Sequence, residues 1–171
     1  MKRLTLVRHA KSSWTNPGSP DRSRPLAARG ERDSRKMGRR LVARKARPSL
    51  ILVSPAVRAH TTAKAIAAAL RYPSEFLQLE DEIYLASPEE IINLIQRQRD
   101  DFSDLMIVGH NPGLTDLVNE LLADFKLENL PTGGVVAIDL DAEEWSKILD
   151  KPARLAYYDY PKNPEVIVIE D

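Results

Sequence analysis

Short apolar runs recur along the chain, and three of them end in a residue suited to binding or attacking a phosphate. The runs and the residues that follow are Leu4–Val7 before Arg8 and His9, Leu50–Val53 before Ser54 and Pro55 with Arg58 three residues further on, and Leu105–Val108 before Gly109 and His110. Runs this short, bounded by turn-forming residues, predict strands buried on both faces of a parallel sheet. Because such sheets bind ligands beyond the carboxyl ends of their strands, the pattern predicts one pocket at that edge.

Helix-spaced apolar residues alternate with these strands. Helices are expected at about Leu26–Lys45, at about Pro55–Leu70, from Ser87 onward and from Asn111 onward. The third has the strongest start signal, because Pro88 suits the first helical position and Glu90 completes a capping box with Ser87. In the first helix one face is small or apolar, and its residues are Gly30, Ser34, Met37, Gly38 and Leu41. The basic residues on the opposite face predict a solvated surface.

The later pattern completes an α/β fold. Val135–Leu140 and Arg154–Tyr160 predict two more strands, and Glu165–Ile169 is either a further strand or an ordered tail. The alternation of strands and helices predicts a three-layer α/β/α sandwich around a central, mostly parallel sheet. With no interdomain linker, residues 1–171 are expected to form a single domain. The polar loop from about Ser12 to Pro25 is long for a compact domain, which favours a functional role.

Composition narrows the classes of function. The formal net charge is zero, so no overall field attracts the chain to nucleic acid or to an anionic membrane. The absence of cysteine excludes disulfides, thiolate metal sites and cysteine nucleophiles. The apolar stretch near Met1 is too short for a signal-peptide core, and no later stretch could span a membrane. We therefore expect a cytoplasmic protein without nucleic-acid or membrane partners.

The predicted pocket gathers groups suited to phosphoryl transfer. Arg58 lies in the first turn of one helix and His110 directly precedes another, and helix N-termini favour anions. A guanidinium group can bind two phosphate oxygens at once, and an imidazole can be a neutral nucleophile or a cationic donor. Neighbouring arginine charges are expected to lower the histidine pKa values in the empty pocket. At least one imidazole would then be neutral and able to attack phosphorus.

Three segments carry a family resemblance. Leu6–Lys11, Val53–Ala59 and Val108–Pro112 resemble the signature segments of the histidine phosphatase superfamily, the phosphoglycerate-mutase-like group. The chain most resembles the small bacterial phosphohistidine phosphatase branch, and the similarity covers nearly its whole length in motif order and spacing. The resemblance implies a phosphoglycerate-mutase-like fold. Ala10 departs from the glycine that usually follows the first motif's histidine, which marks the phosphohistidine branch and disfavours a mutase.

The resemblance also implies a role for each matching residue. His9 resembles the nucleophile that becomes phosphorylated, and His110 resembles the second histidine, which stabilises the transferring group. Arg8 and Arg58 resemble the arginines that bind the phosphate.

Four further residues complete the predicted site. Asp21 and Arg24 belong to a stretch that resembles the segment closing over the site in the small phosphatases, and the resemblance implies that Arg24 is a further phosphate contact. Asn111, in the third segment, is expected to bind substrate. Glu82 lies where many members of the superfamily place a general acid, although an ordinary loop carboxylate is an equal alternative for both Glu82 and Asp21. No metal or cofactor is expected, because the histidines lack the spacing of a helical zinc site and the arginines would repel a cation.

These observations favour a metal-independent phosphatase that works in two steps through phospho-His9. Its expected partner is a phosphorylated protein that carries phosphohistidine. One alternative is a phosphatase for a small phosphorylated metabolite, with Glu82 protonating an oxygen leaving group. Another is a non-catalytic module that binds phosphate. The oligomeric state stays open, a monomer included.

Overall fold

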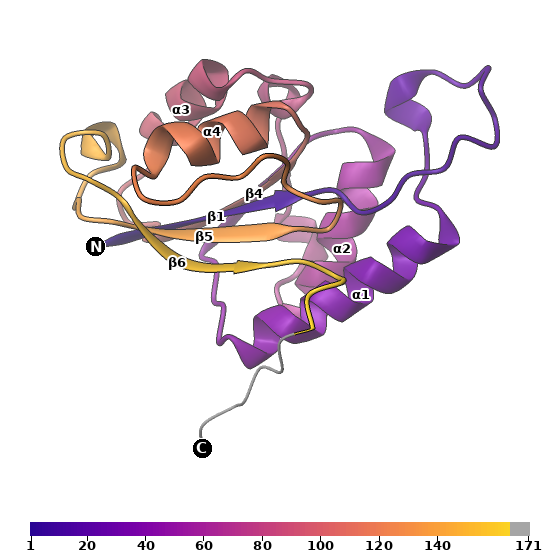
Figure 1. The fold of residues 1–171 in the computed structure, drawn as a ribbon, viewed down its shortest axis with the longest axis horizontal. Helices are drawn as coiled ribbons and strands as arrows, with labels where there is room; N and C mark the ends of the chain where they lie inside the picture. The colour runs from indigo at the N-terminus through magenta and orange to yellow at the C-terminus, as the bar shows by residue number, and fades with distance from the viewer. Residues whose placement is uncertain (165–171) are drawn as a thin grey trace.

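A six-stranded sheet with helices on both faces forms the molecule (Figure 1). The computed structural model describes residues 1–164, so the segment Glu165–Ile169 lies outside the described residues. The strands are β1 (Lys2–Arg8), β2 (Leu50–Val53), β3 (Gln78–Leu79), β4 (Asp104–Gly109), β5 (Val135–Leu140) and β6 (Arg154–Asp159). The expected three-layer α/β/α sandwich is confirmed.

The strand order in the sheet is β3-β2-β4-β1-β5-β6. β3, β2, β4 and β1 run parallel, whereas β5 and β6 add an antiparallel edge next to β1. Val108 pairs with both Val7 and Val53, so β1, β2 and β4 end at the same edge. The residues that follow these three strands therefore meet in space, as the sequence predicted.

Two helices cover each face of the sheet (Figure 1). They are α1 (Ala28–Ala43) and α2 (Val57–Leu70) on one face, and α3 (Pro88–Gln96) and α4 (Gly113–Leu121) on the other. All five residues of the expected inward stripe of α1 are buried. The capping box at the start of α3 is present, because the Ser87 hydroxyl accepts a hydrogen bond from the Glu90 amide and the Glu90 carboxylate accepts one from the Ser87 amide.

The boundaries of two helices differ slightly from the prediction. α1 begins two residues later than expected, because Leu26 pairs with Ser12 in an isolated bridge and belongs to the preceding loop. α4 begins at Gly113, after the expected start at Asn111. The Asn111 side chain lies ahead of the helix, where it accepts hydrogen bonds from the amide and the hydroxyl of Thr115.

Successive residues of the central strands face opposite layers of the core. Leu105 and Ile107 belong to the apolar cluster that includes α3 and α4, whereas Met106 and Val108 belong to the cluster with α1 and α2. Burial on both faces is the reason that these strands are apolar at every position instead of every second one.

Short elements between the strands escaped the sequence prediction. β3 has only two residues, both exposed, so it lacks an apolar signal. The predicted loop from Ser12 to Pro25 contains one 3₁₀ turn, η1 (Asp21–Ser23), which lies beyond the end of β1 (Figure 1). Further 3₁₀ turns are η2 (Ser74–Phe76), η3 (Asp81–Ile83) and η4 (Trp145–Lys147). Within residues 1–164, no helix has the length and apolar character needed to cross a membrane.

The basic face of α1 is only partly solvated, which corrects the sequence expectation. Arg40 donates two hydrogen bonds of 2.8 Å to the carboxylate of Asp159, which is buried at the end of β6, and Arg44 donates a third. These ion pairs attach the edge strand to the helix layer.

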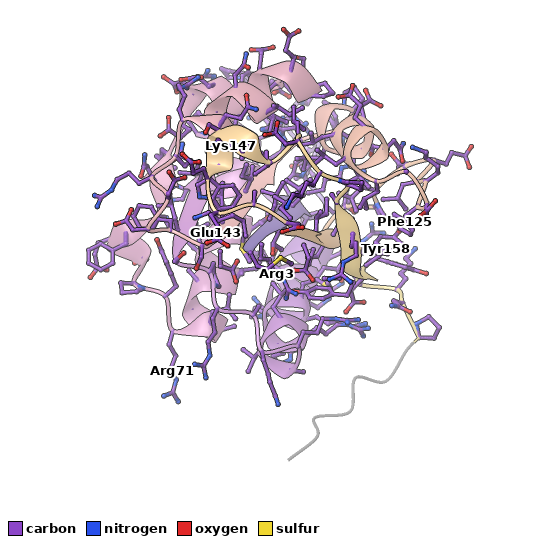
Figure 2. All side chains as sticks on the ribbon, turned by 90° about the vertical axis from the view of Figure 1, so that its left-hand side faces the viewer. Arg3, Arg71, Phe125, Glu143, Lys147 and Tyr158 are labelled. Atoms are coloured by element: carbon purple, nitrogen blue, oxygen red, sulfur yellow. The ribbon has the colours of Figure 1, made fainter. Side chains whose placement is uncertain are left out.

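The two ends of the sheet differ in character. Figure 2 looks onto the end where β1 begins, with Arg3 near the centre of the view. There Arg3 pairs with Asp139. The cationic and imidazole groups predicted to act on phosphate lie at the other end, where β1 stops.

Candidate active site

A cavity of about 310 Å³ opens at the carboxyl ends of β1, β2 and β4. It is lined by Arg8, His9, Lys11, Ser12, Trp14, Asp21, Arg24, Arg58, Leu85, His110, Asn111 and Thr132. The structure thus brings together every residue predicted for the site except Glu82. Three sequence segments far apart in the chain contribute to one cavity, which is the convergence that the strand pattern predicted.

The two histidines lie side by side at the base of the cavity. Their ring centroids are 5.3 Å apart, and both residues are buried. The backbone amide of His9 donates to the carbonyl of Gly109, which joins the end of β1 to the end of β4. The register of the parallel strands therefore places one imidazole beside the other.

The hydrogen bond of His9 defines its reactive nitrogen. Nδ1 lies 2.7 Å from the carbonyl oxygen of Ala10, and a carbonyl oxygen can only accept. Nδ1 must therefore carry the proton, which leaves the lone pair of the neutral ring on Nε2. Because the ring is held by the backbone of the next residue, this orientation follows from the turn that ends β1.

His110 carries the opposite tautomer. Its Nδ1 lies 3.3 Å from Nη2 of Arg58, which can only donate, so Nδ1 accepts. Nε2 then holds the proton and donates to the Ser54 hydroxyl at 2.7 Å. Ser54 is fully buried at the end of β2, so the sheet itself fixes this ring.

Both imidazoles are neutral at physiological pH in the empty cavity. Burial lowers the pKa of His9 to about 4, assisted by the charges of Arg58, Arg8 and Arg24. Burial is also the main cause that lowers the pKa of His110 to about 3, and the charges of His9 and Arg58 lower it further. The expected direction is confirmed, but desolvation is a larger cause than the arginine charges.

The arginines surround the histidines with positive charge. Arg8 donates from Nη1 to the carbonyl of Leu130 at 2.9 Å, and burial lowers its pKa. Arg58 is almost completely buried at the first turn of α2. In the described part of the chain, the Nε groups of Arg8 and Arg58 are buried without a hydrogen-bond partner. An oxyanion in the cavity would supply acceptors beside these two guanidinium groups.

Asp21 is the carboxylate that lines this cavity. Arg58 donates to its backbone carbonyl at 2.8 Å and to its carboxylate at 3.0 Å. The carboxylate also accepts from the Tyr84 hydroxyl and, at 3.2 Å, from Nε of Arg24. These contacts, that of Tyr84 first, lower the pKa of Asp21 to about 2. Asp21 is therefore an anion at neutral pH, and it orients the two arginines.

The comparisons with known proteins agree with this geometry. A family model described as the histidine phosphatase superfamily (branch 1) matches residues 4–106. The chain belongs to the histidine phosphatase superfamily. An uncharacterized protein of Mycobacterium tuberculosis is 30% identical over 167 residues, which cover 91% of this chain and 100% of that protein. Membership of the superfamily identifies the chain as a phosphatase, and so as a hydrolase.

Solved structures of the superfamily share the whole fold. A candidate phosphohistidine phosphatase SixA from Agrobacterium tumefaciens is 28% identical with a TM-score of 0.79, and the match covers 94% of this chain and 98% of that one. The protein histidine phosphatase SixA in complex with tungstate has a TM-score of 0.79 at 21% identity, over 93% and 97% of the two chains. A mycobacterial glucosyl-3-phosphoglycerate phosphatase matches with a TM-score of 0.62 at 14% identity, over 91% and 97%. The last two likenesses show the fold alone.

Glu82 does not line the cavity that holds His9 and His110. Both of its carboxylate oxygens accept hydrogen bonds from Nη2 of Arg97, at 2.8 and 2.6 Å, and both side chains are about half exposed. The reason is the 3₁₀ turn η3, which buries Ile83 in the core and leaves Glu82 facing solvent. The predicted role of Glu82 as a general acid remains a prediction that this geometry does not favour.

Several residues of the site were not singled out from the sequence. Ser54 positions His110, and Tyr84 holds Asp21. Thr62 of α2 accepts from the amide of Ala10 at 3.0 Å and thereby ties the loop after β1 to α2. Ser54 had a signal, a polar residue at the end of an apolar run, but the partners of Tyr84 and Thr62 depend on contacts more than 50 residues apart in sequence.

Metal ligands are not clustered in the described residues. Across residues 1–164, no group of three or more histidine, aspartate or glutamate side chains is placed to hold a metal ion.

Proposed function

We propose that this chain is a protein phosphohistidine phosphatase that works through a phosphorylated His9. The observation that carries the proposal is the hydrogen bond from His9 Nδ1 to the Ala10 carbonyl, which leaves a neutral, nucleophilic Nε2 inside a cationic cavity. Similarity to the candidate phosphohistidine phosphatase of Agrobacterium tumefaciens supports the substrate class.

The first chemical step is an in-line transfer to His9. Nε2 attacks phosphorus and forms a new N–P bond, while the bond from phosphorus to the leaving nitrogen breaks and its electron pair stays on that nitrogen. Arg8 and Arg58 stabilise the equatorial oxygens, as charge-assisted donors do. The negative charge of the phosphoryl group raises the pKa of His110. A proton taken up at Nδ1, in place of the contact with Arg58, would make this ring a cationic donor to the transferring group.

The second step regenerates the enzyme. A water oxygen attacks the phosphorus of phospho-His9, the N–P bond breaks, and its electron pair returns to Nε2, while the protons of the water stay on the phosphate or pass to solvent. Inorganic phosphate then leaves the cavity. This two-step route follows the general logic of covalent catalysis, in which one difficult displacement is divided into two easier ones.

The protonation state of the groups that line the cavity favours phosphohistidine over a phosphate ester as substrate. An alkoxide leaving group needs a strong acid, but the carboxylate that lines the cavity, Asp21, is held ionised by Tyr84 and Arg58. An imidazole leaving group is different, because its second nitrogen titrates near neutrality and can take a proton from solvent. A site with arginine cations and an ionised carboxylate therefore suits a P–N bond.

Replacement of the nucleophile tests the proposal. His9→Ala should lower the rate of phosphate release from a phosphohistidine protein by at least about a thousandfold, as expected when a covalent nucleophile is removed. His60→Ala is the matched control, because His60 lies on α2 outside the cavity lining, and it should keep wild-type activity. Undiminished activity of the His9→Ala variant would rule out the mechanism.

The alternative to this proposal is a phosphatase for small phosphorylated metabolites. That activity would require a proton donor for an oxygen leaving group, and Glu82 is the predicted candidate. Because the Glu82 carboxylate is paired with Arg97 outside the cavity, Glu82→Gln should change phosphohistidine hydrolysis by no more than about twofold, as for other exposed substitutions. A preference for phosphate monoesters that is lost in Glu82→Gln would instead support the metabolite phosphatase.

A further inference from the structure

The mouth of the cavity carries two large apolar side chains that have no role in the proposed phosphoryl transfer. Four of the lining residues are exposed, namely Lys11, Trp14, Asp21 and Leu85. The side chains of Trp14 and Leu85 stand out, because these residues are 65% and 57% exposed. The cavity is thus cationic at its base and partly apolar at its rim, and we call Trp14 and Leu85 the apolar rim.

Trp14 is held in place although it is exposed. The guanidinium group of Arg24 lies 3.5 Å from the centre of its ring, and Arg24 is itself buried and donates to the Ser12 hydroxyl at 2.8 Å. The loop around Trp14 is fastened by a backbone hydrogen bond from Ser13 to Pro25. A cation–π contact therefore orients the indole, and much of its surface remains open to a ligand.

Leu85 is held outward by its backbone. Its φ of 50° lies in the left-handed region, which is unfavourable for leucine. On one side Tyr84 is bonded to Asp21, and on the other the Ala86 carbonyl packs so closely on Gly113 that a Cβ there would lie 2.1 Å away. Strain of this kind persists where neighbours impose it, and it is concentrated at functional sites. Here it presents an apolar side chain to solvent at the entrance of the cavity.

The direction of the reaction indicates what the apolar rim contacts. In an in-line transfer the leaving group lies opposite the attacking nitrogen, so it points away from buried His9 and toward the mouth. We propose that Trp14 and Leu85 bind the imidazole of the phosphohistidine and the residues beside it in a protein substrate. This inference rests on the proposed function and adds the residues that select a protein-borne phosphoryl group.

The chemistry of the leaving group fits these two side chains. A flat imidazole can stack on an indole, and the apolar atoms of a polypeptide gain free energy when leucine covers them. A small hydrophilic phosphate offers neither contact. The arginines and histidines then bind the phosphoryl group of any substrate, whereas the apolar rim distinguishes among carriers.

The test compares one bond type with and without a protein carrier. Phosphoramidate has a P–N bond but no ring and no polypeptide, and a histidine phosphotransfer domain phosphorylated by it provides the protein-borne form. For Trp14→Ala and Leu85→Ala, the ratio of kcat/KM on the phosphoprotein to kcat/KM on phosphoramidate should fall about tenfold, mainly through KM. Trp14→Phe, which can still stack, should recover most of the ratio.

Phe76 provides the matched control, since it is a similarly exposed aromatic residue outside the cavity lining. Phe76→Ala should leave the ratio unchanged. If the wild-type enzyme hydrolyses the phosphoprotein but neither rim variant changes the ratio, the assignment of the apolar rim is wrong and the proposed function stands. If the wild-type enzyme hydrolyses phosphoramidate but not the phosphoprotein, the proposed function itself fails.

Discussion

At the scale of single residues, the site depends on where two protons sit. The Ala10 carbonyl fixes the proton of His9 on Nδ1, whereas Arg58 and Ser54 fix that of His110 on Nε2. The two neighbouring histidines therefore differ in their contacts. His9 presents a lone pair to the cavity, and His110 links Arg58 to Ser54 at the end of β2.

The protonation of these rings can be measured directly. Because burial holds the pKa values of His9 and His110 at about 4 and about 3, both rings should stay neutral as the pH falls through 6.5 and should protonate only near those lower values. ¹⁵N NMR of the imidazoles should show opposite tautomers, and added phosphate should raise the pKa of His110. The denatured protein, with histidines titrating near 6.5, is the reference. Titration of His9 near 6.5 in the folded protein would contradict the assignment.

Residue types at strand ends were predictable from the sequence, but side-chain partners were not. Arg8, His9, Arg58 and His110 reach the cavity because the strands or helices that carry them meet at one edge. The orientation of Glu82 depends on which residue of a 3₁₀ turn enters the core, and that choice has no periodic signal in three residues.

At the scale of elements, the close approach of α1 to the loop after β1 supports the backbone next to His9. A Cβ on Gly30 would lie 2.1 Å from the carbonyl oxygen of Lys11, two residues beyond His9. The same carbonyl accepts from the amide of Ala27 just before the helix. The start of α1 therefore packs directly on the backbone just after His9.

Gly30→Ala should consequently destabilise the fold and disturb the site. Overpacking against backbone costs on the order of 1–3 kcal/mol, so the free energy of unfolding in urea should fall by about that amount, with a loss of kcat/KM. Gly18→Ala is the control, because the nearest atom to a Cβ there is an exposed side-chain oxygen at 3.8 Å. Equal free energies of unfolding for the two variants would contradict this prediction, because they would show that the loop after β1 can move away from the added Cβ at no cost in stability.

Element boundaries illustrate the limits of sequence patterns. The capping box at Ser87 and the inward stripe of α1 were predicted because they have local signals. The start of α1 was misplaced because the isolated bridge between Ser12 and Leu26 is a contact across the long loop. β3 has no signal, since both of its residues are exposed.

At the scale of the whole molecule, a chain with no net charge concentrates cations in one cavity. Arg8, Lys11, Arg24 and Arg58 line it, with Asp21 as the opposing carboxylate. The parallel order of β2, β4 and β1 brings these residues together from distant segments. Composition alone gives no indication of this concentration, whereas the strand pattern does, because it fixes where the strands end.

The central claim is that the phosphoryl group passes through His9. It is tested most directly by mixing the enzyme with a ³²P-labelled phosphohistidine protein, quenching in alkali within milliseconds, and locating the label by peptide mapping. We predict label on His9 in the wild-type protein and in His60→Ala, and none on the enzyme in His9→Ala. Label on any other residue, or release of phosphate by His9→Ala at the wild-type rate, would contradict the account.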